Sequence, residues 1–152
     1  MEPMLGLRLL EEFVHASDYL AVRLKRRQLG PVHLELGWRG EEAAFFYLRR
    51  QGYVVVARGW RSARARGDLD LVAWKDEILC FIEVKTRSSH AVATAESAVD
   101  DEKIRSLRRL ARLYIRDVPT PPEQVRFDIL SIYFEAQKPA DFELFTNAFG
   151  WR

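Results

Sequence analysis

The sequence predicts an α/β protein with a mixed central sheet flanked by helices, in the order α-β-β-β-α-β. Two observations indicate this class. Apolar stretches with helical spacing stand on both sides of several β-branched and aromatic stretches. The first three strands are joined by short connections, which favour antiparallel neighbours, whereas a fourth strand follows a helix and arrives by a crossover. The chain has 152 residues, 48% of them apolar, enough for one domain with a compact core.

The N-terminal segment reads as an amphipathic helix from 6 to 28. Its apolar residues recur at steps near 3.6, and the segment ends in the basic "RLKRRQ" before "LGP". We expect residues 1–36 to form a helical extension to a main domain at 37–152. The apolar face is expected to pack on its own domain or on a second copy of the chain, giving a homodimer. Acidic residues beside that face argue against a membrane-surface helix.

The next elements follow one another closely. A helix is expected after Gly40 over "EEAAFFYLRRQ", closed by Gly52, because glycine suits the left-handed end of a helix. "YVVVARGW" predicts a strand at 53–60, and "RSARARG" predicts a mobile basic connection. Two further strands are expected at about 68–74 and 78–86, with a tight turn between them. Together these segments predict a meander.

The C-terminal half begins with a second amphipathic helix, from 97 to about 116, which "VPTPPE" ends because proline cannot continue a helix. A fourth strand is expected at about 125–134, in "QVRFDILSIYF". The segment "DFELFTNAF" is either a short fifth strand or irregular cover.

Composition excludes several classes of protein. The single cysteine, Cys80, excludes an internal disulfide framework and suits a reducing compartment, so we expect a cytoplasmic protein. Since no apolar run approaches about 18 residues, we expect no membrane span. The three histidines (His15, His33, His90) lack metal-ligand spacing, and a net charge of +2 does not by itself indicate nucleic-acid binding.

Charged residues interrupt the two strands of the predicted hairpin. With a turn centred on Asp76 and Glu77, Asp70 is expected to lie across from Glu83, and Lys85 shares a strand face with Glu83. Facing carboxylates repel unless a cation lies between them, and magnesium prefers oxygen ligands. The pattern favours a divalent-metal site for phosphodiester hydrolysis, with Lys85 near the water and the phosphate. The alternative is a half-exposed hairpin whose outward face carries charges for solubility.

Several sequence blocks, in order, support a specific resemblance. "GWRGEEAAFFYLRRQGYVVVARGWR", "GDLDLVA", "FIEVKTR", "KIRSLRRLARLYI", "RFDIL" and "TNAF" resemble the YraN-like family of small bacterial endonuclease-like proteins. That family is part of the PD-(D/E)xK nuclease superfamily and is similar to Holliday junction resolvases. The resemblance runs from about Gly37 to Phe149 and implies a restriction-endonuclease-like core. Leucine precedes Asp70, where the superfamily name has proline.

The resemblance also implies roles for individual residues. Asp70 and Glu83 match metal-binding carboxylates, Lys85 matches the catalytic lysine, and Glu41 matches an acidic residue near the metal. Asp68 matches a neighbouring acidic position, with either a ligand or a supporting role. The implied function is a Mg²⁺- or Mn²⁺-dependent endonuclease that acts on DNA rather than RNA, with branched or damaged duplexes as substrates by analogy. The rival is a non-catalytic nucleic-acid-binding or adaptor protein that retains the fold.

Other charged residues invite separate interpretations. The second amphipathic helix carries basic residues that we expect to contact phosphates or to form a solvated face: Arg105, Arg108, Arg109 and Arg112. Asp128 interrupts an apolar strand and is expected to give structural support. Cys80 is expected to point into the core and to be inert.

Overall fold

The computed structural model describes residues 32–88 and 100–152. The predicted helix at 6–28, its dimer contact, His15 and His90 lie outside these ranges. The proposed boundary between 36 and 37 lies within a helix, α2, and the division into extension and domain stays a prediction. Within the described ranges, no helix combines the length and the apolar character needed to cross a membrane.

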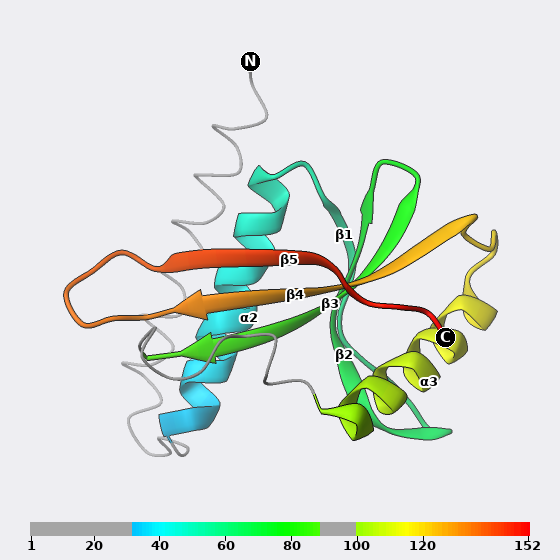
Figure 1. The fold of residues 1–152 in the computed structure, drawn as a ribbon, viewed down its shortest axis with the longest axis horizontal. Coiled ribbons are helices and arrows are strands. Elements are labelled where there is room, and N and C mark those ends of the chain that lie inside the picture. Colours follow the sequence, from blue (N-terminus) through cyan, green and yellow to red (C-terminus); the bar gives the residue numbers. More distant parts are fainter. Residues whose placement is uncertain (1–31, 89–99) are drawn as a thin grey trace, which may run out of the picture.

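The described elements follow the predicted order and add one strand (Figure 1). They are α2 (Val32–Arg50), β1 (Val54–Ser62), β2 (Ala65–Lys75), β3 (Ile78–Arg87), α3 (Asp101–Asp117), β4 (Gln124–Tyr133) and β5 (Asp141–Phe149). The sheet has the spatial order β1-β2-β3-β4-β5. Its β3–β4 pair is parallel and the other pairs are antiparallel, so the mixed sheet and the meander of the first three strands are confirmed.

Two helices cover opposite faces of the sheet. Successive residues of β3 alternate between two buried clusters: Cys80 and Ile82 pack with α2, whereas Leu79 and Phe81 pack with α3. Both faces of β3 are therefore core. The face that carries Glu83 and Lys85 is core over its first half, because α3 covers it there.

Helix α2 begins earlier than predicted, at Val32 rather than after Gly40. Pro31 directly precedes it, and proline is compatible with the first turn of a helix. The predicted end at Gly52 is confirmed. Gly52 has a φ of 83°, its N–H donates to Arg49 O, and the next N–H, of Tyr53, donates to Leu48 O. This pattern is a Schellman motif, which turns the chain directly into β1.

The expected mobile connection at "RSARARG" is wrong. β1 and β2 form one continuous hairpin, in which Ser62 pairs with Ala65. Register shifts at Val55/Ala57 and Trp60/Ser62 let the ladder continue through an arginine-rich segment of low strand propensity. Pairing with the rest of the sheet therefore outweighs the local preference of this segment.

The C-terminal segment forms a full strand rather than irregular cover. β5 pairs antiparallel with β4 and lies at one edge of the sheet. Beyond it, the chain turns toward α3 (Figure 1), where the Trp151 ring stacks on Phe127 and Arg112 lies 5.6 Å from its centroid. The last residues thus complete the core on the α3 side.

Candidate functional site

An open cavity of about 320 Å³ lies where α2 meets the middle of β2 and the second half of β3. We call it the acidic cavity; it is lined by Gly37, Glu41, Asp70, Glu83, Val84, Lys85 and Thr86. Close approach of α2 to β3 depends on Gly40, because a Cβ atom there would lie 2.0 Å from Thr86 Oγ1. The structure thus brings together all four residues predicted as catalytic or metal-binding: Glu41, Asp70, Glu83 and Lys85.

The ladder between β2 and β3 ends immediately before the acidic cavity. The predicted register is confirmed from Lys75↔Ile78 to Leu71↔Ile82, but the next two residues form no further ladder pair. Instead, the carboxylate of Asp70 accepts a hydrogen bond from the Val84 N–H at 2.8 Å. The side chain replaces the backbone partner that the strand would have supplied, and this holds Asp70 beside Glu83.

The carboxyl group of Asp70 is hard to ionise. Burial and the negative charge of Glu83 raise its pKa from 3.8 to about 7, despite the stabilising hydrogen bond from Val84. A nearby positive charge would reverse this repulsion. The proximity of the two carboxylates, which the sequence predicted, therefore raises the pKa of Asp70 in the folded chain.

Glu83 is the most deeply buried charged group of the cavity. Its side chain is only 4% exposed, and its Oε1 lies 2.9 Å from the Lys85 ammonium and 3.0 Å from the Lys103 ammonium. Its Oε2 is buried and accepts no hydrogen bond from the residues at 32–88 and 100–152. The alternative of a half-exposed, solubilising hairpin face is wrong for this residue, since a buried carboxylate needs partners.

Lys103 was not among the residues predicted from the sequence. It lies in the first turn of α3, where the Asp100 side chain caps the helix by accepting from the Lys103 N–H at 2.8 Å. Burial lowers the pKa of the Lys103 ammonium. The charge of Glu83, the hydrogen bond to Glu83 and the charge of Asp70 outweigh this effect, so the pKa lies above its usual value. One signal was present: a lysine in a first helical turn opposes the helix dipole.

Glu41 and Asp68 occupy different surroundings. Glu41 extends from α2 into the acidic cavity, and burial together with the charge of Asp68 raises its pKa, an effect that the charge of Arg58 opposes. Asp68 lies outside the cavity lining and forms an ion pair with Arg61 at 3.0 Å. A supporting role therefore fits Asp68 better than a ligand role.

The carboxylates of the acidic cavity are arranged as a pair rather than as a larger cluster. Within residues 32–88 and 100–152, no group of three or more His, Cys, Asp or Glu side chains has a geometry that could hold a metal ion. Magnesium, however, is commonly held by one or two carboxylates and completes its shell with water and phosphate. The unpartnered Oε2 of Glu83 and the repulsion on Asp70 are what such an ion would relieve. The pair Asp70 and Glu83, with Glu41 nearby, fits Mg²⁺ or Mn²⁺.

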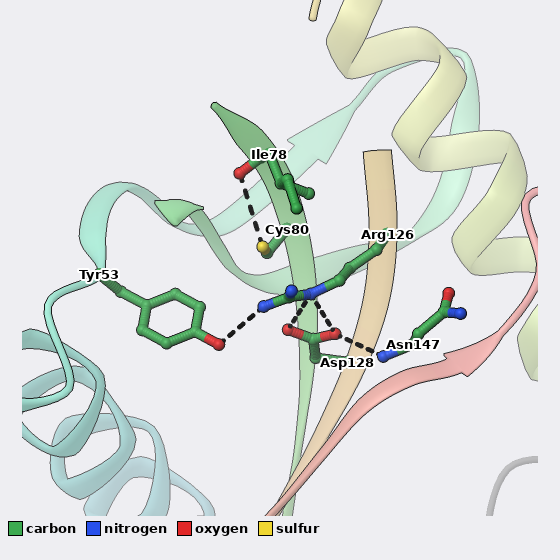
Figure 2. A network of polar contacts seen from close by, with 6 residues as sticks. All are labelled: Tyr53, Ile78, Cys80, Arg126, Asp128 and Asn147. Carbon is green, nitrogen blue, oxygen red and sulfur yellow. Dashed lines mark hydrogen bonds and ion pairs between the residues drawn. The ribbon is translucent and has the colours of Figure 1, made fainter. Parts of the chain in front are cut away.

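A second buried ionic group, on β4, is not part of the lining of the acidic cavity (Figure 2). Asp128 is fully buried on β4, accepts two hydrogen bonds from Arg126 Nε at 2.9 and 3.0 Å, and accepts another from the Asn147 N–H of β5. The Arg126 Nη2 group also donates to the Tyr53 hydroxyl at 2.8 Å. Asp128 therefore joins β4 to β5 and holds Arg126, which reaches Tyr53 directly before β1; this confirms the predicted structural role.

Cys80 lies in the same buried region, and Figure 2 shows its thiol near Ile78. Burial and the charge of Asp128 raise the pKa of this thiol to about 11, so the unreactive protonated form dominates near neutral pH. The side chain is fully buried in the α2-side core, as predicted.

The arginines of α3 divide into two groups. Arg108 donates to Gly150 O at 2.9 Å and Arg112 lies over the Trp151 ring, so both hold the C-terminal segment. Arg105 and Arg109 are exposed, as are Arg112 and Arg116, and Arg109 also donates to Arg64 O at 2.9 Å. This bond joins α3 to the β1–β2 hairpin, whose own exposed arginines are Arg58, Arg61, Arg64 and Arg66. The basic surface thus extends from the helix onto the hairpin.

A mixed sheet in this order, flanked by helices, is compatible with a restriction-endonuclease-like core. Asp70 lies in the middle of β2, Glu83 and Lys85 lie in the second half of β3, and Glu41 faces them from α2. The chain belongs to the family described as "Uncharacterised protein family UPF0102", whose model matches residues 40–132. This is the YraN-like family to which the sequence motifs pointed. The matched range includes α2 from Gly40 and the four predicted residues of the acidic cavity.

Relatives from several bacteria carry the same family name. A UPF0102 protein of Koribacter versatilis (strain Ellin345) is 50% identical over 111 residues, which are 72% of this chain and 76% of that protein. One from Solibacter usitatus (strain Ellin6076) is 47% identical over 116 residues, covering 76% and 86%. One from Bacteroides thetaiotaomicron is 43% identical over 107 residues, covering 68% and 83%.

Proposed function

We propose that this protein is a metal-dependent endonuclease that hydrolyses phosphodiester bonds in DNA, with branched or damaged duplexes as its substrate class. The observation that carries the proposal is the convergence of Glu41, Asp70, Glu83 and Lys85 on one open cavity, where Glu83 Oε2 has no partner. The reducing cytoplasm is the compartment that we propose, in keeping with a single buried cysteine.

Each side chain has a distinct part in the proposed reaction. Asp70 and Glu83 would hold Mg²⁺ or Mn²⁺, and Glu41 would assist from α2. The ion would supply Lewis-acid stabilisation of the charge on the phosphate. Lys85 lies beside Glu83 with its side chain 26% exposed, so its ammonium can meet both solvent and a bound phosphate. It would stabilise the added negative charge and orient the attacking water.

Binding of the nucleic acid would use the basic surface formed by the exposed arginines of α3 and of the β1–β2 hairpin. Phosphate contacts of this kind are independent of base sequence, and each contributes about 0.9 to the slope of log affinity against log salt. We therefore expect a double replacement of Arg64 and Arg66 by alanine, or of Arg105 and Arg109, to weaken binding and to flatten this slope. A double replacement of Arg108 and Arg112 should mainly lower stability, because these residues hold the C-terminal segment.

The rival function is a non-catalytic nucleic-acid-binding or adaptor protein. Such a protein needs the basic surface but has no use for a buried carboxylate with two ammonium groups on one oxygen. Burying these charges is costly, and that cost favours the catalytic proposal.

A cleavage assay on branched DNA, linear DNA and RNA, with Mg²⁺ or Mn²⁺ and with a chelator, tests the proposal. Wild type should cut DNA only with the ion, and Asp70→Asn, Glu83→Gln and Lys85→Met should each lose cleavage. Asp76→Asn is a matched control, because Asp76 lies exposed in the turn of the same hairpin. Binding to DNA without cleavage by wild type under all these conditions would favour the adaptor instead.

A further inference from the structure

The two lysines at Glu83 are held in different ways. Lys85 is on the same strand as the carboxylate, so backbone geometry keeps it close. Lys103 reaches Glu83 Oε1 from the first turn of α3, across the interface between the helix and the sheet. Its side chain is 35% exposed, compared with 4% for Glu83, so the ammonium can reach water while the carboxylate cannot.

The position of Lys103 is unfavourable for the helix itself. A cation in the first turn opposes the helix dipole, and the neighbouring residues Asp101 and Glu102 have the sign that the dipole favours. Burial also disfavours its charged form. The attraction of Glu83 offsets these costs in the structure, since a carboxylate at 4% exposure needs positive partners.

We propose that Lys103 is an exchangeable counter-ion of the acidic cavity: its ammonium neutralises Glu83 while no divalent cation is bound, and the cation displaces it. The inference rests on the proposed metal site and adds a role for a residue outside the four predicted ones. It follows from charge balance, because a divalent cation beside Glu83 would meet an ammonium only 3.0 Å from Oε1. Like charges at such distances repel strongly in a partly buried site.

If Lys103 only supported the fold, its replacement would leave Mn²⁺ affinity unchanged or lower it. The counter-ion role predicts a higher Mn²⁺ affinity instead. Replacing Lys103 with glutamine removes a like charge beside the bound ion, so the affinity for Mn²⁺ should rise by about tenfold or more. The cation-free protein should at the same time become less stable, because Glu83 loses a partner. Lys103→Arg keeps the charge and should keep an affinity close to that of wild type.

Thermal unfolding with increasing MnCl₂ measures both effects without any substrate, because an ion that binds only the folded chain raises Tm with concentration. The inference predicts a lower Tm for Lys103→Gln in chelator and a larger Mn²⁺-dependent rise than in wild type. Lys138→Gln is the matched control, since Lys138 forms an exposed pair with Glu135, and its rise should equal that of wild type.

The possible results separate this inference from the proposed function. A rise that is unchanged or smaller in Lys103→Gln, while wild type responds to Mn²⁺, overturns the counter-ion role and leaves the metal site standing. If neither wild type nor Lys103→Gln responds, both the metal site and the counter-ion role are wrong. If Lys103→Gln is unfolded in chelator, MnCl₂ should refold it, and failure to refold at concentrations that stabilise wild type also counts against the inference.

Discussion

Replacing Asp70 with asparagine should remove a strong pH dependence from the stability of the metal-free protein. The folded chain raises the pKa of Asp70 from 3.8 to about 7, so the folded state binds this proton more tightly than the unfolded state does. The associated stabilisation is fully present below about pH 4 and is lost as the pH rises through about 7. Asparagine carries no charge, and its side-chain oxygen can still accept the hydrogen bond from Val84.

The magnitude follows from the displacement of the pKa. One pKa unit corresponds to about 1.4 kcal/mol, so the change from 3.8 to about 7 corresponds to about 4 kcal/mol in all. Roughly 2 to 3 kcal/mol of this is lost between about pH 5 and about pH 8. As the pH rises from about 5 to about 8, the unfolding free energy of Asp70→Asn minus that of wild type should therefore increase by about this amount.

Urea unfolding in chelator, at several values between about pH 5 and about pH 8, measures the difference between the two proteins. Comparison with Asp76→Asn controls for the general loss of a carboxylate, because Asp76 is exposed and sits at a positive φ that asparagine tolerates. If the difference between Asp70→Asn and wild type stays constant across this range, Asp70 ionises normally and the argument from facing carboxylates is refuted.

Two further predictions concern packing and buried charge. Gly40→Ala should destabilise the protein by about 1–3 kcal/mol, although alanine favours helices, because the new Cβ would meet Thr86 Oγ1. In urea unfolding, adding Thr86→Ala should restore part of the lost stability. Equal losses in the single and double variants would contradict this reasoning. Asp128→Ala should cost about 3–5 kcal/mol by leaving the Arg126 guanidinium without its carboxylate. Lys138→Ala, at an exposed pair, should leave the urea midpoint almost unchanged, and a similarly small loss at both positions would mean that the Asp128 network adds little.

Local patterns were sufficient to predict much of the fold. A continuous apolar run after a tight polar turn located β3, and helical spacing with a glycine stop located the end of α2 at Gly52. The two-residue turn at Asp76 and Glu77 set the register that brings Asp70 near Glu83. One hairpin was therefore enough to predict three of the four site residues that line the cavity. These features depend on short segments of chain, and the residue pattern within each segment is enough to indicate its local structure.

Features that depend on packing between distant segments were not predictable in this way. The "RSARARG" segment has poor strand propensity and becomes a hairpin only because the neighbouring strands pair. The contact of Lys103 with Glu83 depends on how α3 crosses the sheet, which periodicity does not specify. The docking of Arg108 and Arg112 on the last residues likewise needs the complete tertiary structure.

The parallel pairing of β3 with β4 has a consequence for how the chain folds. β1, β2 and β3 form two local hairpins, but the central pair joins Ile78 to Gln124 and needs the whole intervening segment, including α3, to be in place. Closing such a long loop is entropically costly and slows folding. Until β4 arrives, β3 presents an apolar, unpaired edge to any strand that reaches it. Newly made chains that end before β4 should therefore be the form of this protein most prone to aggregate.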